Sequence, residues 1–189
     1  NQASHYVDLV EWLIGPVERV QAMMSTTRDI EAEDTGVVVL KFKSGALGII
    51  EATTATRPIN LEGSVSILGG RGTVEIGGFA VNEMKVWEFM DKRDGDLDAL
   101  KSFRQNPPDV YGFGHTEYLK NVVTSITEDE AALVDGFEGR KSLELVSAIY
   151  ESIETNKEVF INFVPQECRL GMKDIIQDQK EPFSLREMQ

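Results

Sequence analysis

The two histidines of this 189-residue chain are the side chains that titrate nearest neutral pH, so they are the first candidates for acid–base chemistry. His5 lies in the first turn of a stretch, residues 4–14, whose apolar residues repeat at helical spacing. The positive end of a helix dipole disfavours the imidazolium and leaves the neutral ring that a general base needs. The alternative is a His that faces solvent or is satisfied in the core. His115 also begins a predicted helix, and the same alternative applies to it.

Arg57 is a candidate for binding an anion. It lies in the stretch TTATRPI, at the end of a predicted strand, and Pro58 favours an extended backbone before it. A guanidinium can bind a carboxylate or a pyrophosphate through two parallel hydrogen bonds. A surface Arg in a turn is equally compatible with this pattern.

Several common kinds of site are missing from the sequence. It contains no G-x-G-x-x-G, G-x-x-x-x-G-K-[ST] or G-x-S-x-G motif. The glycine-rich stretch at residues 69–78 lies between two predicted strands, so we interpret it as part of a hairpin. One Cys and two His argue against a zinc cluster, and no metal is predicted.

The composition limits the partners and the compartment. A net charge of −13 repels the phosphates of nucleic acids, so no nucleic-acid partner is predicted. No stretch reaches the roughly 18 apolar residues of a membrane span, and none resembles a signal peptide. The single cysteine, Cys168, excludes an internal disulfide and fits a reducing compartment, which predicts the cytoplasm.

The elements that position these residues can be read from periodicity and turn residues. The helix at residues 4–14 has Ser4 as a possible N-cap and ends at Gly15 and Pro16. Trp12 and Trp87 are assigned to core packing because tryptophan at apolar spacing usually belongs there. Strands are predicted within residues 17–27, 35–56, 63–78, 81–89 and 159–163, and helices at residues 115–126 and 139–158.

The strands within residues 35–56 carry little charge on either face. In the first strand Val37 and Val39 face one way, and Val38, Leu40 and Phe42 face the other. In the second strand Leu47 and Ile49 are opposite to Gly48, Ile50 and Ala52. Because the chain's own helices can cover only one of these faces, the other face predicts a homo-oligomer formed through the sheet. Residues 91–110 are polar and irregular, which predicts a functional or mobile loop.

An ordered series of segments resembles one family. The opening segment, NQASHYVDLVEWLIGPVERVQA, is similar to D-x-G-x-H-x-x-D-x-x-x-W-L-x-G in the substrate domain of the Gfo/Idh/MocA oxidoreductases. These are NAD(P)-dependent dehydrogenases of sugars, inositols and sugar nucleotides. The similarity continues through LKFKSGALGIIEAT and SVSILGGRGTVEI and ends with DGFEGRKSLELVSAIYESIETNKEVFI, so it covers residues 1–163.

The resemblance implies roles in catalysis for the opening segment. In the family, the first Asp and the His of the motif lie in the active site, beside a Lys from the nucleotide-binding domain. His5 matches that His, Asp8 matches the downstream Asp, and Asn1 stands where most members have the first Asp. An Asn can orient a hydroxyl but cannot accept a proton at neutral pH. The NQASH pattern looks closest to the branch that oxidises the 3-hydroxyl of UDP-N-acetylglucosaminuronate or a similar nucleotide sugar.

The resemblance also implies a fold and a domain organisation. The expected fold is α+β, a large and mainly antiparallel β-sheet with helices on one face. Tyr111 and His115 precede a helix whose start lies near the substrate in the family, so contact with the substrate is expected. NAD or NADP is expected to bind mainly to a Rossmann domain that precedes the substrate domain in the family and is absent here.

We therefore expect residues 1–164 to form a substrate-binding and oligomerisation domain, incomplete at its N-terminus, followed by a tail at residues 165–189. The fragment alone is expected to be inactive. Two alternatives stay open: a family member that acts on a free sugar or an inositol, and a binding or assembly module without chemistry. The choice between NAD and NADP and the number of subunits also stay open.

Overall fold

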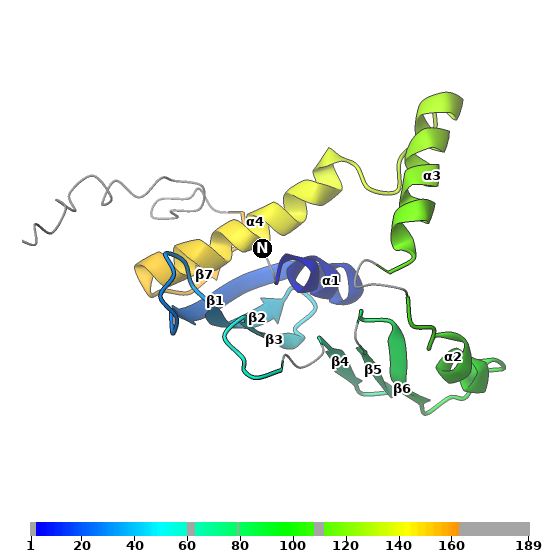
Figure 1. Ribbon diagram of the computed structural model, residues 1–189, viewed down its shortest axis with the longest axis horizontal. Coiled ribbons are helices and arrows are strands. Elements are labelled where there is room, and N and C mark those ends of the chain that lie inside the picture. The colour runs from blue at the N-terminus through cyan, green and yellow to red at the C-terminus, as the bar shows by residue number, and fades with distance from the viewer. Residues whose placement is uncertain (1–2, 60–62, 79, 108–111, 163–189) are drawn as a thin grey trace, which may run out of the picture.

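A computed structural model describes residues 3–59, 63–78, 80–107 and 112–162 (Figure 1). The order of elements is α1 (Ser4–Ile14), β1 (Val17–Ser25), β2 (Thr35–Phe42), β3 (Leu47–Thr53), β4 (Val65–Gly69), β5 (Gly72–Gly77), β6 (Glu83–Phe89), α2 (Asp96–Ser102), α3 (Gly114–Glu128), α4 (Gly136–Thr155) and β7 (Val159–Phe160). The tail at residues 165–189 lies outside the described residues, as do Asn1 and Tyr111.

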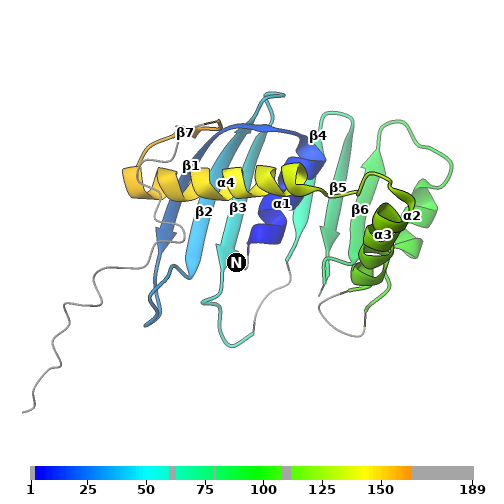
Figure 2. The same ribbon diagram turned by 90° about the horizontal axis from the view of Figure 1, so that it is seen from above.

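The strands pair antiparallel throughout, as the sequence predicted. They form a four-stranded sheet in the order β3-β2-β1-β7 and a three-stranded sheet in the order β4-β5-β6. Figure 2 shows the two sheets side by side, with α4 crossing over the strands of the first. Helices α1 and α4 cover the same face of the four-stranded sheet (Figure 1). This arrangement confirms the α+β fold of antiparallel strands and helices.

The core lies between the four-stranded sheet and the helices α1 and α4. Val20 and Leu40 of the sheet and Leu145 of α4 are each 1% exposed, and Val7 of α1 packs in the same cluster. Residues on β2 alternate between buried and exposed, because successive side chains of a strand point to opposite faces. The predicted two-sided pattern is therefore confirmed, with one face in the core and the other open.

A buried serine joins α4 to the sheet. The Oγ of Ser152 accepts a hydrogen bond from the backbone N–H of Ala22 at 3.0 Å and donates one to the carbonyl of Lys157 at 2.6 Å. Ser152 is fully buried, and both of its hydrogen-bonding roles are filled by backbone groups. The hydroxyl therefore fixes the end of α4 against β1 without leaving a buried polar group unsatisfied.

The structure corrects predictions about the two tryptophans and about the segment at residues 91–110. Trp12 is not a core residue, because its side chain is 76% exposed on α1. Trp87 is half-buried, and its ring packs edge-on against Phe89 while its indole N–H donates to Asp96 Oδ1 at 3.0 Å. That contact connects β6 to α2, a helix inside the segment that was predicted to be irregular.

No helix in the described part of the chain is long and apolar enough to cross a bilayer.

Candidate functional site

The outward face of α1 carries the polar residues of the opening segment. His5, Asp8 and Trp12 are all exposed, and they follow one another at intervals of three and four residues, which places them on one side of the helix. Val7 on the opposite side is 4% exposed, and Val10 packs with it against the core. The helix therefore exposes an imidazole, a carboxylate and an indole on the side opposite to the core.

The ends of α1 are formed by backbone contacts. The carbonyl of Ala3 accepts hydrogen bonds from the amides of Tyr6 and Val7, each at 3.0 Å. No side chain caps this end, so the prediction that Ser4 is the N-cap is wrong. At the other end Gly15 has a φ of +102°, a conformation that favours glycine, and its N–H donates to the carbonyl of Glu11 at 2.9 Å. His5 thus lies within the first turn, as predicted.

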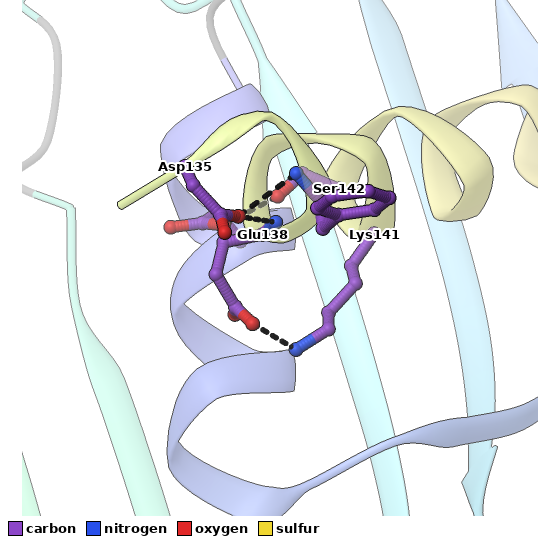
Figure 3. Close-up of polar contacts among 6 residues, drawn as sticks. Asp135, Glu138, Lys141 and Ser142 are labelled. Atoms are coloured by element: carbon purple, nitrogen blue, oxygen red, sulfur yellow. Dashed lines mark hydrogen bonds and ion pairs between the residues drawn. The ribbon is translucent and has the colours of Figure 1, made fainter. Parts of the chain in front are cut away.

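Helix α4 supports α1 from the side through polar contacts near its own N-terminus (Figure 3). The hydroxyl of Ser142 donates to the carboxylate of Asp8. About two turns earlier, Asp135 caps α4 by accepting from the amides of Phe137 and Glu138, each at 2.9 Å. Because Asp8 follows His5 by one helical turn, the Ser142 contact fixes the part of α1 that carries His5.

A partly buried carboxyl, that of Glu11, lies on the same helix as Asp8. Burial raises the pKa of Glu11 above its ordinary value, against the opposing effects of the Val17 amide and the Lys141 ammonium. Its Oε2 atom is buried and has no hydrogen-bond partner among the described residues. Lys141 bonds Glu138 at 2.6 Å, and that hydrogen bond raises the pKa of the Lys141 amine. Between α1 and α4 there are therefore a carboxyl whose pKa is raised by burial and an ammonium.

Sequence reasoning missed Glu11, Lys141 and Ser142. Ser142 and Asp8 are separated by 134 positions along the chain, and no local spacing links them. In the sequence, Glu11, Lys141 and Ser142 cannot be distinguished from the ordinary polar residues of an amphipathic helix. The only available signal was that both segments belong to the series that resembles the family.

The loop after β3 reaches the first turn of α1. A Cβ atom added at Gly63 would lie 1.4 Å from the hydroxyl oxygen of Tyr6, so only glycine allows this approach. Burial in this contact region raises the pKa of the Tyr6 hydroxyl. Arg57 belongs to the same loop, where its Nη1 donates to the carbonyl of Thr56 at 2.5 Å and its side chain is exposed. The loop that carries Arg57 thus returns to the helix that carries His5.

His115 is not brought to the same place. It is the second residue of α3 and is exposed. Helix α3 has no buried residue, and both views show it apart from the N-terminal end of α1 (Figures 1 and 2). The predicted roles of Asn1 and Tyr111 fall outside the described residues.

The described residues do not form a cradle for a dinucleotide or a metal ion. The glycines at residues 69–72 make the turn between β4 and β5, and a Cβ at Gly72 would lie 2.4 Å from the ring of Phe89. That glycine is needed for packing against an aromatic ring and does not lead into a helix N-terminus, where a pyrophosphate would bind. No group of three or more His, Cys, Asp or Glu residues within the described ranges could hold a metal.

Comparison with known families decides the relationship. Residues 1–161 match the Gfo/Idh/MocA oxidoreductase family, C-terminal alpha/beta domain. The chain belongs to this family. The resemblance seen in the ordered segments is confirmed.

Solved structures of the family share this fold. The chain is 45% identical to the WlbA dehydrogenase from Bordetella pertussis in complex with NADH and UDP-GlcNAcA, with a TM-score of 0.77 over 87% of this chain and 47% of that one. The WlbA dehydrogenase from Chromobacterium violaceum, also in complex with NADH and UDP-GlcNAcA, is 47% identical with a TM-score of 0.77, over 87% and 46% of the two chains. A levoglucosan dehydrogenase, at 21% identity and a TM-score of 0.65, shares the fold over 86% of this chain and 49% of its own.

Another relative is named for a substrate other than UDP-GlcNAcA. Myo-inositol 2-dehydrogenase from Thermotoga maritima is 29% identical over 163 residues, which are 82% of this chain and 46% of that protein. The chain thus spans about half the length of the relatives it matches.

Proposed function

We propose that this chain supplies the substrate side of an NAD(P)-dependent dehydrogenase that oxidises a hydroxyl of a nucleotide sugar, UDP-N-acetylglucosaminuronate or a close analogue. The observation that carries the proposal is the outward face of α1, where His5 and Asp8 are exposed on a helix whose other side is anchored in the core. The 45–47% identity to two WlbA dehydrogenases bound to UDP-GlcNAcA supports this substrate class.

The reaction converts an alcohol into a ketone. The sugar C–H bond breaks with transfer of its electron pair as a hydride to the nicotinamide, and the hydroxyl proton leaves to a base. His5 is that base, or assists a Lys of the nucleotide-binding domain, as the family resemblance implies. Ser142 holds Asp8, and through it the first turns of α1, so that the imidazole keeps one position relative to the substrate.

The remaining candidates bind the substrate. Asn1 orients the sugar hydroxyl, and Arg57 binds the carboxylate or the pyrophosphate, both of which a nucleotide sugar of this class contains. Tyr111 and His115 contact the substrate from the start of α3. For His115 this requires that α3 move toward α1, or that the substrate extend along the molecule to reach it.

The dinucleotide is bound mainly by a nucleotide-binding domain, because the described residues offer no phosphate cradle. Calorimetry of the 189-residue chain with NAD and with NADP should therefore give no saturable heat, and the chain alone should not oxidise substrate. Saturable binding of either dinucleotide would contradict this division of roles.

A substrate panel on the complete enzyme tests the proposed function. NAD(P)H formation should be fastest with UDP-N-acetylglucosaminuronate and much slower with a free sugar or myo-inositol. The reverse order would favour the alternative of a free-sugar or inositol dehydrogenase, which the Thermotoga relative supports. No turnover with any of them, in an enzyme that binds the dinucleotide, would favour a binding or assembly module.

Variants of Arg57 sharpen the substrate assignment. If Arg57 binds the carboxylate, Arg57→Ala should raise the KM for the uronate and leave unchanged the KM for UDP-N-acetylglucosamine, whose sugar has no carboxylate. If it binds the pyrophosphate, the KM for both should rise. Arg71→Ala, which removes an exposed Arg from the β4–β5 turn, is the matched control. Equal kinetics for Arg57→Ala and the control would remove Arg57 from the site.

We further propose that the chain forms a homo-oligomer through the open face of the four-stranded sheet. Met23, Val37, Val39, Leu47 and Ile49 on this face are 43–77% exposed. Static light scattering at micromolar concentration should give at least twice the mass of the chain, and a monomer would contradict the proposal.

A cytoplasmic location fits the single cysteine and is a prediction from composition.

A further inference from the structure

Helix α3 has an apolar side and a polar side. Leu119, Val123 and Ile126 are spaced by four and three residues, so they lie on one side of the helix, and they are 58–77% exposed. Glu117 and Glu128 lie on the opposite side. No residue of α3 is buried. The helix therefore has the amphipathic pattern of an element that packs against a neighbour, but its apolar side is open in the described part of the chain.

Figure 1 shows α3 projecting away from both sheets and from α1. The amide oxygen of Asn121 accepts a hydrogen bond from the backbone N–H of Leu133 at 3.0 Å, which joins the helix to the linker that follows it. A helix of fifteen residues is only marginally stable in water unless its apolar side is packed. Helix α3 therefore requires a neighbour that the described residues do not supply.

More apolar side chains are exposed where the linker leads into α4. Leu133, Val134, Phe137 and Leu143 are 55–76% exposed. Phe137 and Leu143 also line a hollow of about 580 Å³ at the start of α4. These four residues and the apolar side of α3 make up what we call the α3–α4 surface. Apolar side chains exposed together on neighbouring elements are typical of a contact with another protein surface.

The α3–α4 surface borders the face that carries His5. Ser142, the neighbour of Leu143 on α4, donates to the carboxylate of Asp8 on the outer side of α1. A domain that brings the nicotinamide to His5 would therefore lie beside this part of α4. The open face of the four-stranded sheet points the other way, because α4 covers the opposite face (Figure 1). A second copy bound to the open sheet face thus leaves the α3–α4 surface uncovered.

We propose that the N-terminal half of the complete enzyme packs on the α3–α4 surface and fixes the position of α3. The inference rests on the proposed function, in which that half contains the nucleotide-binding domain. Two findings support this occupant: the chain spans about half the length of its relatives, and the family model that it matches describes a C-terminal domain. Because His115 is the second residue of α3, this packing also sets where His115 stands relative to the substrate.

Hydrogen exchange of the backbone amides tests the packing of α3. In the 189-residue chain the amides of α3 should exchange fast, because the helix can open without disturbing the core. In the complete enzyme they should exchange roughly 10²-fold slower or more. The amides of β1, which lies in the core of both proteins, are the internal reference. Equal protection of α3 in the two proteins would overturn the proposal, and light scattering of the chain would then show whether a second copy covers the helix.

Substitutions on α3 identify the side that is covered. Val123→Asp should lower the thermal midpoint of the complete enzyme by roughly 5 °C or more, because it buries a carboxylate among apolar groups. In the 189-residue chain the midpoint should change by no more than about 2 °C, because the position is exposed. Lys120→Gln changes the net charge by the same amount at an exposed position of the same helix, and it should leave both proteins unchanged. If the Val123→Asp enzyme does not fold, Ile126→Ala should give the same contrast with a smaller shift.

Two outcomes of the substitutions would overturn the proposal. Equal shifts in the complete enzyme and in the chain would mean that α3 packs within this chain, and no shift in either would mean that the surface stays uncovered. None of these measurements uses a substrate. An enzyme that failed the substrate panel but showed the contrast would keep this contact and lose only the proposed substrate.

Discussion

The two sides of α1 differ in what they contribute. The inner side packs Val7 and Val10 against the sheet and α4, and it fixes the helix in place. The outer side presents His5, Asp8 and Trp12, and its one described polar contact with another element comes from Ser142. The eleven residues of α1 thus pack against the core on one side and expose polar and aromatic side chains on the other.

The difference fits the proposed function, in which a second domain would complete the site. A side chain that must meet a substrate or a nucleotide-binding domain cannot also be buried in its own core. The polar and aromatic residues of the opening motif are therefore placed where they add little to the stability of the described domain. Substitutions on the two sides should separate activity from stability.

The largest expected effect concerns His5. In the complete enzyme, His5→Ala should lower turnover by roughly 10²–10⁴-fold, the usual range for a general acid–base group. The thermal midpoint should change little, because the side chain is exposed on the first turn. Initial rate and thermal midpoint are measured on the same preparation. A rate within about threefold of the wild type would remove His5 from the mechanism.

The core against which the inner side of α1 packs should show the opposite behaviour. Leu145 of α4 is 1% exposed in the core cluster that includes Val7, so Leu145→Ala should lower the free energy of unfolding by about 2–5 kcal/mol. Turnover per folded molecule should stay near the wild-type value. Urea denaturation together with active-site titration checks both expectations. A variant that kept its stability while losing turnover would break the comparison between the two sides.

The fold should also lose stability at acidic pH for reasons that lie outside α1. Burial by itself raises the pKa of Asp34, but four hydrogen bonds, donated by Thr27, Arg28 and Thr35, outweigh it and lower the pKa below the ordinary value. A carboxyl with a lowered pKa stabilises the folded state above its unfolded pKa of about 3.9, and this contribution is lost as the pH falls below that value.

Thermal midpoints of the wild type and Asp34→Asn between pH 7 and pH 3 check this expectation. The difference between the two proteins should be largest at neutral pH and should shrink below about pH 4. A constant difference over the whole range would mean that Asp34 stabilises the loop by packing alone.

The smallest effect is expected for Trp12. Its indole is 76% exposed, so Trp12→Ala should change the free energy of unfolding of this chain by no more than about 0.5 kcal/mol. A core tryptophan would cost about 3–5 kcal/mol. Chemical denaturation distinguishes the two values. A large loss in the 189-residue chain would return Trp12 to a packing role.

The sequence predicted the elements of the fold well, because local signals specify them. The helical repeat and Gly15 set the limits of α1, and Gly45, with a φ of +91°, makes the turn between β2 and β3 that the KSGA stretch indicates. Helix α2 was missed because seven residues give too short a repeat to stand out in a polar segment. The two apolar faces of β2 followed directly from the two-residue period of a strand.

The sequence alone also determined the family-like order of segments, and with it the positions of His5 and Asp8 on one side of a helix. Only the tertiary structure decided that Trp12 faces outward, that Ser142 reaches Asp8, that the Arg57 loop returns to α1 at Gly63, and that Val38 is covered while Val39 is open. The physical reason is the range of the forces involved. Periodicity and turn preferences act over a few residues, whereas burial depends on which distant segments pack together. The sequence of a single strand or helix does not specify which distant segment packs against it.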